Sequence, residues 1–306
     1  MNTQLERPVV FTCGRWPLLG VLHPALGGQA RHGVLIIVGG PQYRVGSHRQ
    51  FVHLARALAA ANVPVLRFDC RGMGDSAGQF TTFEHIGADV RAAIDAFLRE
   101  IPQLEQIVLF GLCDAASAAL MYCCSDTRVG ALALANPWVR TASGEAASYV
   151  RHYYGHRVLQ MGFWRKLLSG RLNALAAFAD LVRSLARMRS SGGQWDRSKS
   201  FIDEMVLGLE GFAGPVLLLL SDRDLTAKEF QELSRTSPKW TSLLGRSSVD
   251  TRTCARADHT FSSVEARERM TSMMIDWLQG RRQQPAPGDA ARTAPRHRYF
   301  EGERLS

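Results

Sequence analysis

Short apolar, β-branched runs alternate along this chain with longer segments whose apolar residues recur three and four positions apart. Strands joined by such helical crossovers lie parallel, with helices covering both faces of the sheet. The alternation therefore predicts an α/β fold with a mostly parallel central sheet. The predicted strands are 33–40, 64–72, 107–111, 130–138, 214–224 and 249–258, and the predicted helices are 47–63, 82–100, 114–124, 227–235 and 264–280.

Two segments depart from this rhythm. Residues 137–212 are mostly helical in pattern and rich in Arg, Leu and aromatic side chains, so we expect a helical cap inserted into the core. At the N-terminus, two apolar runs flank a tight turn at 14–17 and predict an antiparallel hairpin at one sheet edge. The predicted domains are core residues 1–136, the cap 137–212, core residues 213–280 and a disordered basic tail, 281–306.

Composition limits the class of protein. No apolar run approaches the roughly 20 residues that a membrane-spanning helix needs, and the N-terminus lacks the basic start and apolar stretch of a signal peptide. The six cysteines show no Cys-x-x-Cys spacing, so neither a zinc site nor a disulfide framework is predicted. These features favour a cytoplasmic protein with reduced thiols, no metal and no cofactor.

The net charge of +9 is concentrated in the cap and the tail. Residues 137–212 carry 11 basic and 6 acidic side chains, and residues 281–306 carry 6 and 3. Such segments favour anionic substrates, anionic lipid or an acidic partner. Covering the active site is the favoured role of the cap, and transient membrane-surface contact is the alternative. No nucleic-acid module is recognisable, so no nucleic acid is expected as a partner. The oligomeric state stays open.

The stretch Gly-Leu-Cys-Asp-Ala lies between a predicted strand and a predicted helix. It matches the Gly-x-Ser-x-Gly turn of hydrolases, with Cys113 in place of the serine and with Gly111 and Ala115 as the small neighbours. A helix N-terminus and a nearby imidazole both favour a thiolate nucleophile. Asp114 opposes this if its carboxylate faces the sulfur. The alternative interpretation is a buried thiol in a tight turn.

Two polar residues that follow later strands complete a possible catalytic triad. The working residues of such sheets gather at the carboxyl ends of strands, and the chain order Cys113, Asp224, His259 is that of the α/β-hydrolase fold. We predict that His259 acts as general base and then acid, oriented by Asp224. Asp222 is the rival acid, and Asp258 is interpreted as an acceptor that fixes its loop.

An oxyanion hole needs two backbone N–H groups aimed at the developing negative charge. One is expected from Asp114, directly after the nucleophile. The other is expected from the loop GGPQYRVGSH after residues 34–38, where Pro41 has no N–H and both Gly40 and Gln42 stay candidates. The candidates for substrate contact from the cap are Trp138, Tyr153, Trp164 and Arg165.

Several segments together resemble the exosortase A system-associated hydrolase 1 family, within the α/β-hydrolase superfamily. They are GGPQYRVGSHRQF, LRFDCRGMGDS, FGLCDAASA, SDRD and DHTFS. The resemblance covers residues 5–280 and implies a bacterial enzyme linked to exopolysaccharide loci and to the sorting of C-terminally tagged envelope proteins. It also implies that Cys113, Asp224 and His259 occupy the superfamily's triad positions. The thiol in place of serine is similar to that of dienelactone hydrolase, whereas Ala115 replaces the usual elbow glycine.

Two classes of function follow. The first is a cysteine-dependent acyl hydrolase or acyltransferase that acts on a small-molecule or lipid-linked ester or thioester. The second is a non-catalytic partner of envelope-assembly machinery that presents its basic cap to a membrane protein or a lipid-linked saccharide.

Overall fold

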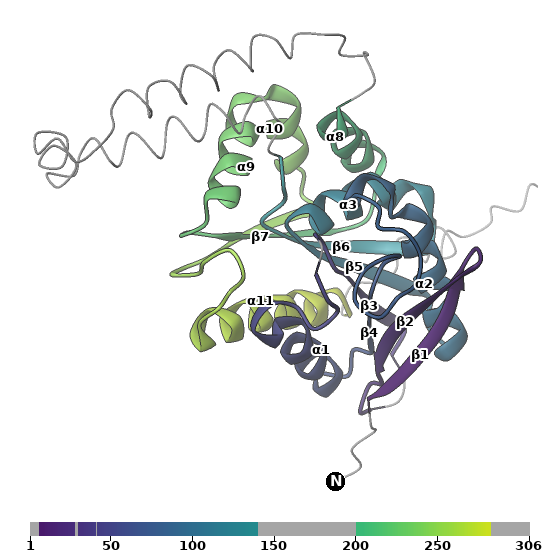
Figure 1. The fold of residues 1–306 in the computed structure, drawn as a ribbon. Coiled ribbons are helices and arrows are strands. Elements are labelled where there is room, and N and C mark those ends of the chain that lie inside the picture. The colour runs from purple at the N-terminus through teal and green to yellow at the C-terminus, as the bar shows by residue number, and fades with distance from the viewer. Residues whose placement is uncertain (1–5, 28–29, 41, 140–199, 283–306) are drawn as a thin grey trace, which may run out of the picture.

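The computed structural model describes residues 6–27, 30–40, 42–139 and 200–282. Eight strands form one sheet in the order β1-β2-β4-β3-β5-β6-β7-β8 (Figure 1). β2 pairs antiparallel with β1 and β4, and every other neighbouring pair is parallel, which confirms the predicted fold class and the edge hairpin. The strands are β1 (Arg7–Cys13), β2 (Trp16–His23), β3 (His32–Ile37), β4 (Val65–Phe68), β5 (Gln106–Leu112), β6 (Val129–Ala135), β7 (Val216–Ser221) and β8 (Val249–Cys254).

Helices cover both faces of the sheet. α1 and α11 pack together on one face, and α2, α3 and α8 lie on the other (Figure 1). The helices are α1 (Gln50–Ala60), α2 (Gly87–Glu100), α3 (Asp114–Tyr122), α8 (Phe201–Gly211), α9 (Leu225–Thr236), α10 (Pro238–Leu244) and α11 (Val264–Arg282). α10 was not predicted, although Pro238 at its first turn is a favoured helix start.

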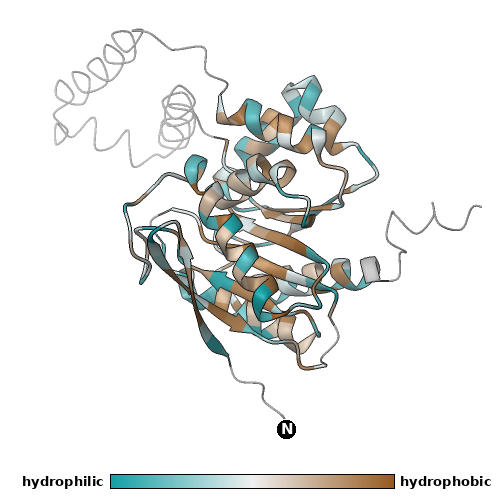
Figure 2. Ribbon diagram, turned by 90° about the vertical axis from the view of Figure 1, so that its right-hand side faces the viewer, coloured by the Kyte–Doolittle hydropathy of each residue, from teal (hydrophilic) through white to brown (hydrophobic). Residues whose placement is uncertain are grey.

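Burial explains the apolar runs in the sequence. β4 and β7 are buried at every position, because helices lie on both of their faces, so their side chains do not alternate in polarity. In β1, exposed and buried positions alternate, as expected of an edge strand covered on one face. In Figure 2 the central strands are largely hydrophobic, whereas the helices around them carry both hydrophobic and hydrophilic residues.

The expected cap lies mostly outside the described residues, and so do Tyr153, Trp164, Arg165 and nearly all of the expected tail. The end of the cap segment, α8, packs against α3. At Gly208 this approach is so close that a Cβ would lie 1.9 Å from the carbonyl oxygen of Leu120. None of the helices in the described part combines the length and apolarity that a membrane crossing requires.

Candidate active site

Cys113 occupies a strained turn between β5 and α3. Its φ of 63° and ψ of −125° place a non-glycine residue in a region that L-residues rarely adopt. The turn is tied to the end of the sheet, because the Cys113 N–H donates to the carbonyl of Ala135 (2.9 Å) and its carbonyl accepts from the N–H of Trp138 (3.2 Å). This is the geometry of a nucleophile elbow, which presents its side chain at the carboxyl end of the sheet.

The elbow requires glycine at position 111. A Cβ there would lie 2.4 Å from the carbonyl oxygen of Ala115. We expect Gly111→Ala to lower the free energy of unfolding by about 2 kcal/mol, because overpacking a tight site forces the backbone to move. Urea unfolding measures the change. The control is Gly280→Ala in α11, where an added Cβ would meet nothing within 4 Å apart from the neighbouring backbone of its own helix, and helix propensity favours alanine. Equal losses in both variants would contradict the steric argument.

Asp224 holds His259 from the start of α9. One Asp224 oxygen accepts from the N–H of Thr226 (3.2 Å), and the other accepts from that of Ala227 (3.1 Å) and lies 2.8 Å from His259 Nδ1. The rival carboxylate, Asp222, instead accepts from the N–H of Ala257 (3.1 Å). The structure therefore brings Asp224 to the histidine and leaves Asp222 on a neighbouring loop.

His259 lies between a carboxylate and a thiol. Hydrogen bonds to Asp224, first, and to Cys113, second, raise the pKa of His259 to about 10, against the opposing effect of its burial. The imidazole therefore carries a proton at neutral pH, on a ring that the carboxylate fixes in orientation. Asp258 fixes the loop, as expected, because it accepts from the N–H of Ser262 (2.8 Å).

Asn136, which the sequence analysis did not select, connects the end of β6 to the end of β7 and to the backbone of His259. Its Nδ2 donates to Ser221 Oγ (3.0 Å) and to the carbonyl of His259 (3.2 Å), and its Oδ1 accepts from the N–H of Ser221 (2.8 Å). Asn136 is completely buried. The available signal in the sequence was a polar residue directly after a buried strand.

The loop after β3 reaches the elbow through Gly40, whose N–H donates to Asp114 Oδ2 (2.6 Å). Arg44 anchors this loop: its guanidinium pairs with the buried Asp69 and with Asp75 (2.8 Å). The Arg44 N–H also donates to Asp69 Oδ1 (2.6 Å). The conspicuous GGPQYRVGSH segment is therefore fixed through a buried ion pair.

Removing one partner of that pair has a predictable cost. We expect Arg44→Met to lower the free energy of unfolding by about 3 kcal/mol, because it leaves the fully buried Asp69 carboxylate without its cation. Chemical denaturation measures this change. In the control, Arg235→Met breaks an exposed pair with Glu232 and is expected to cost under about 1 kcal/mol; a similar loss in both variants would show that burial is not the reason.

A cavity of about 300 Å³ lies over these groups. It brings together six of the predicted site residues, Gly40, Gln42, Cys113, Asp114, Trp138 and His259, and is also lined by Gly39, Phe51, Phe83 and Leu112. The walls are largely aromatic and aliphatic, with the thiol and imidazole as convergent polar groups, as is typical of a small-molecule site. Among the described residues, no cluster of His, Cys, Asp and Glu could hold a metal ion.

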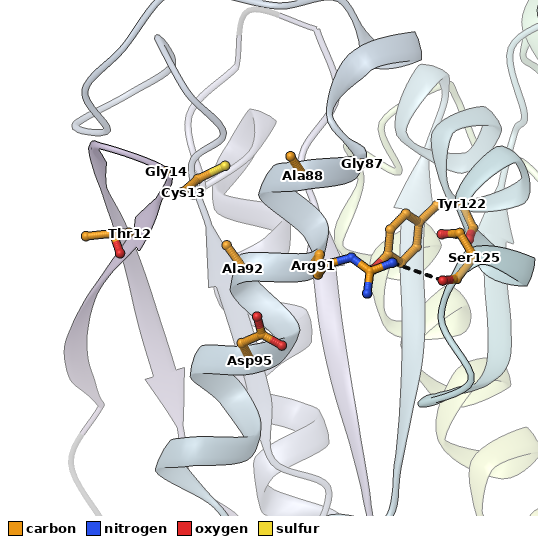
Figure 3. A pocket seen from close by; sticks show the side chains of 10 residues that line it. All are labelled: Thr12, Cys13, Gly14, Gly87, Ala88, Arg91, Ala92, Asp95, Tyr122 and Ser125. Atoms are coloured by element: carbon orange, nitrogen blue, oxygen red, sulfur yellow. Dashed lines mark hydrogen bonds between the residues drawn. The ribbon is translucent and has the colours of Figure 1, made fainter.

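A second, wider hollow of about 520 Å³ lies between the β1–β2 turn and α2 (Figure 3). Its charged side chains already have partners within the protein. Arg91 donates to the carbonyl of Ser125 (3.0 Å), and Asp95 pairs with Arg128. This hollow therefore lacks the free, convergent polar groups of the cavity at Cys113.

The elbow, the acid and the histidine, at three strand ends of this sheet, define the α/β-hydrolase class of architecture. Residues 32–272 match the model of the alpha/beta hydrolase family, and the chain belongs to that family. No curated protein matches the sequence.

Solved structures share this fold at low sequence identity. The Pyrococcus furiosus esterase Pf2001 is 16% identical, with a TM-score of 0.60, over 90% of this chain and 92% of that one. Est1E from Butyrivibrio proteoclasticus, solved with ferulic acid bound, is 13% identical with a TM-score of 0.56, over 88% and 99%. The α/β hydrolase GrgF from Penicillium sp. sh18 is 18% identical with a TM-score of 0.58, over 90% and 98%.

Proposed function

We propose that this protein is a cysteine-dependent acyl hydrolase that cleaves a carboxylic ester or thioester. The observation that carries the proposal is the position of His259, which is held by Asp224 at Nδ1 (2.8 Å) and lines the same cavity as Cys113 at the strained elbow. A nucleophile, a base within reach and a third group that orients the base are the parts of a covalent acyl-transfer mechanism.

In this mechanism the Cys113 thiolate attacks the substrate carbonyl carbon and forms a tetrahedral oxyanion. The oxyanion collapses to a Cys113 thioester, while the His259 imidazolium gives its proton to the departing alcohol or thiol. Neutral His259 then takes a proton from water, whose oxygen attacks the thioester. Collapse of this second tetrahedral intermediate releases the carboxylic acid and expels the Cys113 thiolate. The proton taken from water stays on His259, so the thiolate and the imidazolium are restored. The expected oxyanion donors are the N–H of Asp114 and that of Gly40 or Gln42.

The substrate class follows from the cavity and from the family. Aromatic and aliphatic walls suit an apolar acyl group, and one structural neighbour, Pf2001, is an esterase by name, while another, Est1E, was solved with ferulic acid bound. We propose a cytoplasmic enzyme whose substrate is a small-molecule or lipid-linked acyl compound. The loop and elbow segments that resemble the exosortase-associated family support a place in bacterial exopolysaccharide and envelope-protein systems.

The test is a panel of short- and long-chain esters and thioesters, followed by mass spectrometry of the denatured protein. We expect turnover together with an acyl group of the substrate's mass on the peptide that contains Cys113. Release of free acid supports hydrolysis, whereas transfer to an added alcohol or thiol identifies an acyltransferase. Absence of both turnover and acylation would reject the enzyme and favour the non-catalytic partner. Its binding to anionic vesicles should then depend on basic residues of the expected cap 137–212, such as Arg165 and Arg171.

A further inference from the structure

The Asp114 carboxylate lies where an acyl oxyanion is expected to bind. Its Oδ2 accepts from the N–H of Gly40 (2.6 Å) and its Oδ1 from the N–H of Ala115 (2.9 Å). Burial raises the pKa of Asp114, whereas the N–H groups of Gly40, Ala115 and Asp114 itself lower it. One of its two hydrogen-bond donors, the N–H of Gly40, is a candidate donor to the oxyanion, and the N–H of Asp114 itself is the other expected donor.

Gly39 makes room for this carboxylate. A Cβ on Gly39 would lie 1.8 Å from Asp114 Oδ1 and 2.8 Å from the backbone nitrogen of Ala115. Gly39 is not in the left-handed region, so space, and not backbone conformation, explains the glycine. The loop that contains Gly39 and Gly40 therefore leaves space for the Asp114 side chain, and the elbow turn also binds it through the N–H of Ala115. The position of the carboxylate is thus supported by the backbone on both sides and not by its rotamer alone.

The consequence is electrostatic. A carboxylate oxygen carries a negative charge of the kind that the substrate carbonyl develops during attack, and it uses the same donors. While Asp114 holds the Gly40 N–H, that donor is unavailable to a substrate. The carboxylate also adds negative charge to a site in which a thiolate must attack and a second negative oxygen must form.

We propose, building on the acyl hydrolase function, that the Asp114 carboxylate occupies the oxyanion hole. It must be displaced before the substrate can acylate Cys113. Rotation about the Cα–Cβ bond of Asp114 frees the N–H of Gly40. The free energy for this displacement comes from binding the rest of the substrate in the cavity. Asp114 thereby discriminates against small esters that make few contacts with the aromatic walls, and it protects the thiol from unproductive acylation.

The experiment compares two rates in wild type, Asp114→Asn and Asp114→Ala. Alkylation of Cys113 by iodoacetamide forms no oxyanion, so its rate reports only thiol reactivity. Turnover of p-nitrophenyl acetate, a small ester, reports thiol reactivity and the oxyanion hole together. We expect the ratio of ester kcat/KM to alkylation rate to rise at least about tenfold in Asp114→Ala. A smaller rise is expected in Asp114→Asn, whose neutral amide oxygen can still accept from Gly40.

A ratio that stays constant or falls in Asp114→Ala overturns the proposal, and a fall would identify Asp114 as a group that supports the hole. Asp222→Asn is the matched control, because this exposed carboxylate contacts only the neighbouring loop, and its ratio should equal that of wild type. The Gly40 amide proton shift is independent of turnover and should move upfield in Asp114→Ala. If no variant turns over ester, the acyl hydrolase function fails, while an unmoved Gly40 shift rejects the occupancy itself.

Discussion

Cys113→Ala is expected to reduce kcat/KM on activated esters by roughly 10³-fold or more, since removing a triad nucleophile leaves only binding and the oxyanion hole. Cys113→Ser should keep part of the activity, because the elbow and His259 remain in place. Steady-state kinetics on one ester measures both effects, once circular dichroism has shown that wild type, Cys113→Ala and Cys113→Ser are equally folded. The thioester that we expect on the peptide containing residue 113 should be absent in the alanine variant.

The matched control for this prediction is Cys124→Ala. Cys124 is exposed at the far end of the elbow helix, where its thiol donates to the carbonyl of Gly208 (3.0 Å). This variant should retain wild-type turnover. Activity that survives in Cys113→Ala, or falls equally in Cys124→Ala, would show that the elbow thiol is not the nucleophile.

Asp224→Asn is expected to lower kcat/KM by up to about 10⁴-fold. The single amide oxygen of asparagine can still accept from one of the two N–H groups at the start of α9, and asparagine is itself a favoured N-cap residue, so the helix start keeps a side-chain cap. The variant removes the charge beside His259 Nδ1 and allows the wrong ring tautomer. Asp222→Asn separates the two candidate acids, since it keeps an acceptor for Ala257 and should leave turnover unchanged.

The pH profile provides a second readout of the same pair. In the proposed mechanism His259 donates a proton to the leaving group, and its pKa is raised to about 10 chiefly by Asp224. In wild type, kcat/KM on a poor leaving group should therefore fall as the pH rises through about 10, where the imidazolium loses its proton. In Asp224→Asn the pKa of His259 is lower, so this alkaline limb should move to lower pH. An unmoved limb would mean that another group donates the proton.

The sequence allowed much of the fold to be predicted because its signals were local. Apolar runs marked six of the eight strands with approximate ends, and the N-terminal hairpin was read from its turn. The helix expected over 82–100 is divided into a short turn, Phe83–His85, and α2. α10 was missed because its seven residues are too few to show a helical period.

The site was predictable in part for the same reason. A strand end is visible in a sequence, so Cys113, Asp224 and His259 could be selected as candidates at three of them. Asn136 was overlooked because its bonds to Ser221 and His259 cross 85 and 123 positions of the chain. Contacts over such separations leave no local pattern.

The sequence by itself determined the class of fold, since periodicity and chain order restrict how strands and crossover helices can be arranged. It also singled out Cys113, Asp224 and His259 as candidates for the site. Only the tertiary structure decided between Asp222 and Asp224 as the partner of His259, and only it revealed the Asp114 carboxylate on the Gly40 N–H, between groups 74 positions apart. The physical reason is that a side chain's reactivity depends on the charges and hydrogen-bond donors within a few ångströms of it, and packing brings these together from distant parts of the chain.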